Sequence, residues 1–299
     1  MVKIKIPATT ANMGAGFDCF GMALNMYNEL TVQEAEEFSV EIVQAREGTA
    51  KSHLTKDNLI YQTMARFYDE IGRTIPNLKL TQNDKIPIAR GLGSSSACIV
   101  AGLFAANELT QRPMNKDELA EMACRIEGHP DNVAPAVYGG FVVAVMEEDK
   151  FNFVKIKPSD ELSFITFIPD FQVPTGKARR ILPQEYSRAD AIFNISRASL
   201  FIASMMSKNW DNLPVSVDDR IHQPYRGKLV PNMDVIFKHA KNIGAKGVFM
   251  SGAGPTIIAI ALRSEAQKFE KKMKSYLKEL PNAWQTFVLD ADYEGALIL

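Results

Sequence analysis

Residues 87–97 read PIARGLGSSSA, and the apolar run ACIVAGLFAANEL continues from Ala97. The run is apolar on nearly all sides, which predicts a buried central helix over 94–110. Serine is a poor residue inside a helix but a good one at its start. The start of a helix presents free N–H groups and a positive dipole end, and glycine lets a loop approach a ligand closely. We therefore expect a phosphate site here, with one serine capping the helix and another facing the phosphate or a metal ion.

Two further stretches are rich in small residues, PATTANMGAGFD (7–18) and SGAGPT (251–256). Each lies at the end of an expected strand. Any one of the three stretches could be a purely structural turn. The chain contains neither G-x-x-x-x-G-K-[ST] nor G-x-G-x-x-G, so a nucleotide site would have to use a different loop.

A polar cluster occurs at EGHPDNVAPAVYGG (127–140), directly after an expected helix. It is either a polar turn or a cradle for a small hydrophilic substrate. Downstream, PTGKARRILP (174–183) and HQPYRGK (222–228) place arginines beside prolines in expected loops. These arginines are either solvated surface charges or bidentate ligands for a carboxylate.

The composition is that of a globular protein: 299 residues, 46% hydrophobic, 23% charged, with a formal net charge of −1. The charge argues against a nucleic-acid partner, and the apolar runs are too short to span a bilayer. The start, MVKIKIPATT, has no apolar signal region. Three scattered cysteines are expected to be buried thiols in a reducing cytoplasm, and no histidine has metal-ligand spacing.

Strands and helices are mixed without strict alternation, which favours an α+β protein with two lobes. Asn115 and Glu118 form a predicted capping box, with Gly128 as the stop. The polar segment 147–161 is the expected lobe boundary. Strands are expected at 2–6, 39–45, 77–82, 139–146, 162–169, in two runs within 246–262, and at 284–289; helices are expected at 58–73, 94–110, 115–128, 188–207, 231–243 and 264–280.

Taken together, the motifs resemble those of the GHMP kinase superfamily. Its signature P-x3-G-L-G-S-S-[AS]-A is met by Pro87, Gly91, Leu92, Gly93, Ser94, Ser95, Ser96 and Ala97. Within the superfamily the chain is most similar to the homoserine kinase family, whose first, central and third motifs resemble PATTANMGAGFDCFGMAL (7–24), HPDNVAPAVYGG (129–140) and SGAGPT (251–256). The resemblance extends from end to end of the chain.

This resemblance implies the two-lobed GHMP kinase fold, with a ribosomal-protein-like α/β lobe (1–155) and a ferredoxin-like lobe (156–299). It implies transfer of the ATP γ-phosphate to the side-chain hydroxyl of L-homoserine, a step of threonine biosynthesis, with Mg²⁺ as the metal. It also implies a homodimer.

The resemblance assigns roles to individual residues. Those expected to bind ATP are Asn58, Pro87, Arg90, Gly91, Leu92, Gly93, Ser94, Ser95 and Ser96. Ser95 and Glu121 are expected at the metal, with Glu127 as the alternative carboxylate. Those expected to line the amino-acid pocket are Asn12, Asp18, His129, Asp131, Asn132, Arg179 and Arg226, the two arginines gripping the substrate carboxylate.

Mevalonate-kinase-like members carry a lysine in the first motif that helps to activate an aspartate base, and Thr9 stands at that position here. We therefore expect catalysis by positioning and charge stabilisation, with Ser95, Asp131 and Asn132 as the catalytic residues. Asp131 would hold the substrate ammonium and Asn132 would orient the hydroxyl. A kinase for another small alcohol and a non-catalytic ligand sensor are the alternatives. Residues 173–183 are expected to form a mobile loop.

Overall fold

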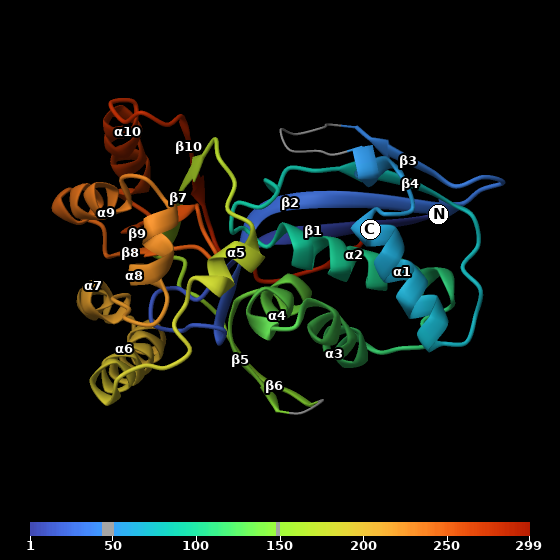
Figure 1. Ribbon diagram of the computed structural model, residues 1–299, viewed down its shortest axis with the longest axis horizontal. Coiled ribbons are helices and arrows are strands. Elements are labelled where there is room, and N and C mark those ends of the chain that lie inside the picture. Colours follow the sequence, from blue (N-terminus) through green and yellow to red (C-terminus); the bar gives the residue numbers. More distant parts are fainter. Residues whose placement is uncertain (44–50, 148–149) are drawn as a thin grey trace.

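The computed structural model describes residues 1–43, 51–147 and 150–299, and its strands form two sheets (Figure 1). The first sheet has the order β11-β1-β2-β4-β3, and β5 and β6 extend it from β2. Its strands are β1 (Val2–Ala11), β2 (Phe20–Glu34), β3 (Ser39–Ile42), β4 (Leu78–Asn83), β5 (Phe141–Glu147), β6 (Lys150–Ile156) and β11 (Leu297–Ile298). The strand predicted at 39–45 is thus confirmed over Ser39–Ile42, while residues 44 and 45 lie outside the described residues.

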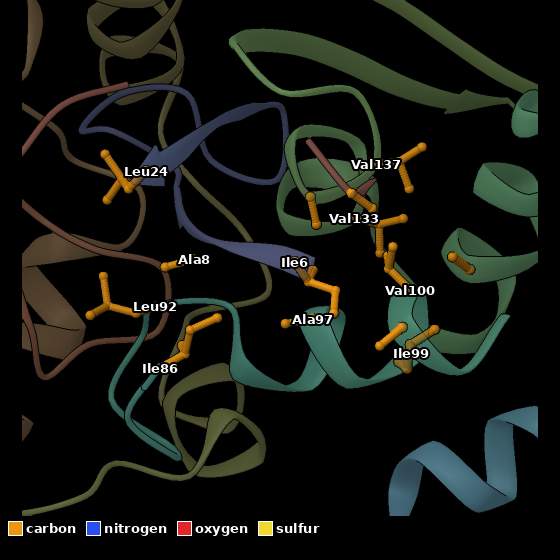
Figure 2. Packing of buried hydrophobic residues seen from close by; sticks show 14 of the residues in the cluster. Ile6, Ala8, Leu24, Ile86, Leu92, Ala97, Ile99, Val100, Val133 and Val137 are labelled. Atoms are coloured by element: carbon orange, nitrogen blue, oxygen red, sulfur yellow. The ribbon is translucent and has the colours of Figure 1, made fainter. Parts of the chain in front are cut away.

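Four α-helices belong to this lobe: α1 (Leu59–Glu70), α2 (Ser94–Leu109), α3 (Lys116–Glu127) and α4 (Pro130–Tyr138), with a short 3₁₀ turn at Lys51–Leu54. The capping box is confirmed, since Asn115 and Glu118 bond each other's backbone N–H and Gly128 ends α3 in the left-handed conformation. Helix α2 is buried along most of its length, as its apolar sequence predicts. Figure 2 shows Ala97, Ile99 and Val100 of α2 near Ile6 of β1 and Val133 of α4. These contacts hold the first turns of α2 against the middle of β1.

The second sheet is antiparallel throughout, with the order β10-β7-β9-β8. Its strands are β7 (Leu162–Pro169), β8 (Gly247–Met250), β9 (Ile257–Leu262) and β10 (Trp284–Leu289). The helices of this lobe are α5 (Thr175–Arg180), α6 (Arg188–Ser207), α7 (Leu213–Ser216), α8 (Gln223–Arg226), α9 (Met233–Asn242) and α10 (Ala266–Leu277), with 3₁₀ turns at Trp210–Asn212 and Gly227–Leu229. None of the helices in the described part of the chain has the length and apolar character that a membrane crossing requires.

The main hydrophobic core extends from the first lobe into the second. All of β7 is buried, and its alternate residues face different clusters. Phe164 and Ile168 join the cluster that includes the first sheet, whereas Ile165 and Phe167 pack with α9 and α10. A sheet buried on both faces needs apolar residues at every position, which explains the unbroken run LSFITFIP.

The lobe boundary predicted between residues 155 and 156 therefore needs correction. It falls inside β6, which pairs with β5 up to Ile156. The C-terminal residues also leave the second lobe, because β11 pairs with β1 and Ala291 bridges to Leu24. The polarity of Lys150–Ile156 reflects a strand at the edge of the sheet rather than a linker. Figure 1 shows both termini at the first lobe.

Two segments predicted as loops contain short helices, and so does the polar cluster 127–140, for which a polar turn was one of the two interpretations. Residues 174–183 contain α5, 222–228 contain α8, and 127–140 contain α4. Proline is the common cause: Pro174 precedes α5, and Pro130 and Pro224 lie in the first turns of α4 and α8. A proline in the first turn loses no helical hydrogen bond, so it starts a helix as readily as it forms a loop.

Candidate active site

A cavity of about 290 Å³ lies where the two lobes meet. The first lobe contributes the loop after β1, the glycine-rich loop before α2, and the starts of α2 and α4. The second lobe contributes α5, α8 and the loop after β8. The predicted site residues that line the cavity are Asn12, Asp18, Asn58, Arg90, Gly91, Gly93, Ser94, Ser95, Glu127, His129, Asp131, Asn132, Arg179 and Arg226.

The three small-residue stretches converge at this cavity. Asn12 Nδ2 donates to the Gly252 carbonyl at 2.9 Å, and Ser251 Oγ donates to the Gly91 carbonyl at 2.5 Å. Gly91 has φ +76°, and a Cβ there would come within 2.3 Å of the Ser251 carbonyl oxygen. Only glycine permits this packing. The third motif (251–256) therefore packs directly against the glycine-rich loop before α2 at Gly91.

The start of α2 differs from the prediction in one respect. The N-cap residue is Gly93, at φ +70°, and no side chain caps the helix. The expectation that a serine caps α2 is therefore wrong. The serines occupy the first turn instead, which leaves the free N–H groups and the dipole of α2 available to an anion.

Glu127 is the carboxylate that reaches the serines. Its Oε2 accepts from Ser95 Oγ at 2.9 Å and its Oε1 accepts from Ser96 Oγ at 3.0 Å. Glu121 is not among the residues that line the cavity. Glu127, the alternative carboxylate, therefore lies beside the serines, whereas Glu121 lies five intervening residues earlier on α3 and away from the cavity lining.

The donor set at this point suits Mg²⁺. The ion prefers oxygen ligands and is commonly held by one or two carboxylates together with phosphate oxygens and water. Glu127 and the Ser95 hydroxyl provide such oxygens. Among the described residues there is no group of three or more His, Cys, Asp or Glu that could hold a metal by itself.

Several residues predicted at the nucleotide have structural side chains. Arg90 lies at the cavity wall, but its guanidinium donates to the carbonyls of Pro169, Ile88 and Asp170 at 2.8–3.0 Å. Leu92 is fully buried in the core, and neither it nor Pro87 lines the cavity. Ser96 is also buried and acts through Glu127. These residues shape the loop rather than face a ligand.

Asn58 lies on the cavity wall, but its amide is used internally. Its Oδ1 accepts from Ile60 N–H at 2.9 Å and caps α1, while Nδ2 donates to the His53 carbonyl and to Gln82 Oε1, both at 2.7 Å. Asn12 is similarly occupied, since its Oδ1 accepts from the Asp18 N–H at 2.9 Å. Both residues hold backbone segments in place at the cavity.

A chain of side-chain contacts crosses the start of α4. Asp131 is 3% exposed, and its Oδ1 lies 2.8 Å from His129 Nδ1 and accepts from Asn132 Nδ2 at 3.3 Å. Asn132 Oδ1 accepts from Thr9 Oγ1 at 2.8 Å. The structure thus brings together the three predicted residues of the central motif and adds Thr9 from β1.

The two predicted arginines lie side by side above Phe17. Arg179 donates to both carboxylate oxygens of Asp18, at 2.8 and 3.0 Å. Arg226 is 2% exposed and donates to the carbonyls of Ala178 and Gly252, each at 3.1 Å. The Phe17 ring centroid lies 5.0 Å from Arg226 Cζ and 5.9 Å from Arg179 Cζ. At these distances the aromatic ring attracts both guanidiniums through cation–π interactions.

The sequence analysis did not single out Phe17. Its signal was its place directly before Asp18 in a stretch that otherwise consists of small residues. Because ligand contacts were expected from polar groups alone, the apolar Phe17 was not among the predicted site residues.

Electrostatics in the cavity follow from burial and pairing. Burial acts to lower the pKa of His129, but the hydrogen bond and charge of Asp131 outweigh it, so the pKa of His129 is raised above 6.5. Burial lowers the pKa of Arg226, and repulsion by Arg179 adds to this. Burial also raises the pKa of the Cys98 thiol to about 12, so that thiol stays protonated. Because burial and the neighbouring Arg179 both disfavour the charge on Arg226, an anionic ligand bound beside it would stabilise that charge.

Comparison with known proteins agrees with this geometry. Residues 58–140 match the GHMP kinases N terminal domain, and residues 199–279 match the GHMP kinases C terminal domain. The homoserine kinase of Clostridium botulinum is 44% identical over 303 residues, which cover 100% of this chain and 99% of that protein. The chain belongs to the homoserine kinase family. A second member, from Caldicellulosiruptor saccharolyticus, is 42% identical over 100% of this chain and 96% of its own.

A solved structure of the family supports the fold. The crystal structure of homoserine kinase from Cytophaga hutchinsonii superposes with a TM-score of 0.88 at 29% identity, covering 100% of this chain and 97% of that one. The α+β GHMP kinase fold predicted from the motifs is confirmed.

Proposed function

We propose that this protein transfers the γ-phosphoryl group of ATP to the side-chain hydroxyl of L-homoserine and releases ADP and O-phospho-L-homoserine. One observation carries the proposal: a single cavity joins an uncapped helix N-terminus in a glycine-rich loop to a pair of guanidiniums and a buried carboxylate. The first feature suits phosphates and the second suits a zwitterionic amino acid.

Recognition of the amino acid follows from the charges. Arg179 and Arg226 bind its carboxylate, and Phe17 supports both guanidiniums from below. Asp18 orients Arg179 through the two-pronged ion pair. Asp131 binds the ammonium through Oδ2, which has no hydrogen-bond partner among the described residues.

Phosphoryl transfer uses the other end of the cavity. The amides of Gly91 to Ser95 and the dipole of α2 bind the β- and γ-phosphates. Ser95 and Glu127 would hold Mg²⁺, which supplies charge neutralisation on the phosphates when bound. Asn132 orients the substrate hydroxyl toward the γ-phosphorus. The new O–P bond forms as the bond to the β-phosphate oxygen breaks, and the hydroxyl proton passes late to a phosphate oxygen.

This route needs no dedicated base. The loose transition state of phosphoryl transfer places little demand on a base and much on alignment. Thr9 cannot supply the positive charge by which a lysine would activate Asp131. The carboxylate is instead held by His129 and Asn132, as suits an ammonium ligand.

We propose that the enzyme is a cytoplasmic homodimer of threonine biosynthesis. Three free cysteines agree with a reducing cytoplasm, and the product suits threonine biosynthesis. A homodimer is supported by apolar side chains exposed along α6, where Ile192, Ile195 and Met206 are 56–67% exposed. Sedimentation of the pure protein tests the dimer.

The reaction is tested by ADP release from Mg-ATP with and without L-homoserine, with the product identified by mass. Homoserine-dependent ADP with the mass of phosphohomoserine is expected. Mevalonate and a hexose serve as alternative acceptors, and turnover of either in place of homoserine would overturn the substrate. ATP binding with no turnover of any alcohol would instead favour a ligand sensor.

A further inference from the structure

We propose that Thr9 is the positioning residue for Asn132, and that its hydroxyl sets the alignment of the substrate hydroxyl with the phosphate loop. This inference rests on the proposed function, in which Asn132 orients the acceptor. Thr9 is fully buried in β1 and does not line the cavity, so it acts through its neighbour and not on the substrate.

The direction of each hydrogen bond follows from chemistry. The Asp131 carboxylate only accepts, so the Asn132 group that contacts it at 3.3 Å must be the amide NH₂. The amide oxygen then points to Thr9, and Thr9 Oγ1 must donate across 2.8 Å. The Thr9 hydroxyl and the Asp131 carboxylate together define one orientation of the Asn132 amide. Without the hydroxyl, the oxygen side of the amide has no protein donor among the described residues.

Thr9 also contacts the phosphate loop. Its N–H donates to the Leu92 carbonyl at 3.2 Å, and a Cβ on Gly93 would lie 1.9 Å from Thr9 Oγ1 and 3.2 Å from Asn132 Oδ1. The hydroxyl therefore lies between the N-cap of α2 and the first turn of α4. The buried Thr9 hydroxyl thus fixes the distance between the Asn132 amide, which orients the acceptor, and the glycine-rich loop, which binds the phosphates.

The experiment compares Thr9→Val, which keeps the shape and removes the donor, with Thr9→Ser, which keeps the donor. Thr166→Val is the matched control, because Thr166 is a fully buried strand threonine whose hydroxyl bonds only the Phe287 carbonyl. We expect Thr9→Val to lower kcat about 5- to 10-fold with both KM values changed less than about twofold. Thr9→Ser should recover most of the loss, and Thr166→Val should leave kcat unchanged.

The outcomes separate this inference from the proposed function. If the wild-type protein does not phosphorylate homoserine, the proposed function fails first. If it does and Thr9→Val keeps full kcat, the positioning role is overturned. The role is also overturned if Thr9→Ser fails to recover activity although both variants melt at the wild-type temperature. A loss of the same size in Thr166→Val would assign the effect to buried threonines in general.

Discussion

Replacing Asp131 by asparagine separates a substrate-binding carboxylate from a catalytic base. The change is isosteric, and the new amide oxygen can still accept from His129 and Asn132, which both contact Oδ1. What disappears is the negative charge at a position that is 3% exposed. A hydrogen bond to a charged group contributes about 1.5–3 kcal/mol, which corresponds to a factor of about 10 to 150 in binding.

We therefore expect the KM for homoserine to rise about 10- to 150-fold, with kcat at saturating homoserine lowered less than about fivefold. The assay is ADP release at fixed saturating Mg-ATP over a range of homoserine concentrations. The variant should also show a lower pKa for His129 by NMR titration, because the charge that raises this pKa is gone.

Asp292→Asn is the matched control, since Asp292 is a buried carboxylate outside the cavity that accepts from Tyr27 Oη and Gly295 N–H. It should lower stability and leave the homoserine KM unchanged. A fall in kcat of about a thousandfold with little change in KM would refute the reasoning, because it would make Asp131 a base.

Three further predictions concern the metal, pH and the phosphate loop. Glu127→Gln should raise the Mg²⁺ concentration needed for half-maximal rate at least about tenfold, whereas Glu121→Gln should leave it unchanged; equal effects would contradict the proposal that Glu127 holds the metal. Because pairing with Asp131 raises the pKa of His129, protonated His129 stabilises the fold below pH 6.5, and this contribution is lost as pH rises through the raised pKa. The melting-temperature difference between wild type and His129→Gln should accordingly be largest below pH 6.5 and shrink as the pH rises through the raised pKa, and a constant difference would count against the ion pair. Gly93→Ala should destabilise the fold by about 1–3 kcal/mol and weaken ATP binding, since φ is +70° and the added Cβ would come within 1.9 Å of a buried hydroxyl; calorimetry and ATP titration test both.

The motifs made the family and the buried elements predictable. The apolar run at 94–110 forms α2, the Asn115 box starts α3, and LSFITFIP is the strand buried on both faces. Local signals suffice for these because helix caps and apolar periodicity act over a few residues. The candidate residues of the central motif lie together for the same reason, since His129, Asp131 and Asn132 are neighbours in the chain.

Contacts across the chain were beyond the reach of local signals. Glu127 and Glu121 are the same residue type on one helix, and only the packing of α3 against α2 places Glu127 beside Ser95 and Ser96. The segments 174–183 and 222–228 contain prolines that are compatible with either a loop or the start of a helix. In the folded chain both segments contain a helix, α5 and α8.

The sequence by itself determined the GHMP kinase fold and predicted a phosphate loop and a polar cradle, because each of these rests on motifs of consecutive residues. The tertiary structure alone decided which polar groups remain for ligands. Arg90, Asn58 and Asn12 bond the protein itself, whereas Thr9 and Phe17 support the residues that face the cavity. The physical reason is that a polar group already bonded within the protein is not free to bind a ligand. Which groups are bonded in this way depends on distances between segments far apart in the chain.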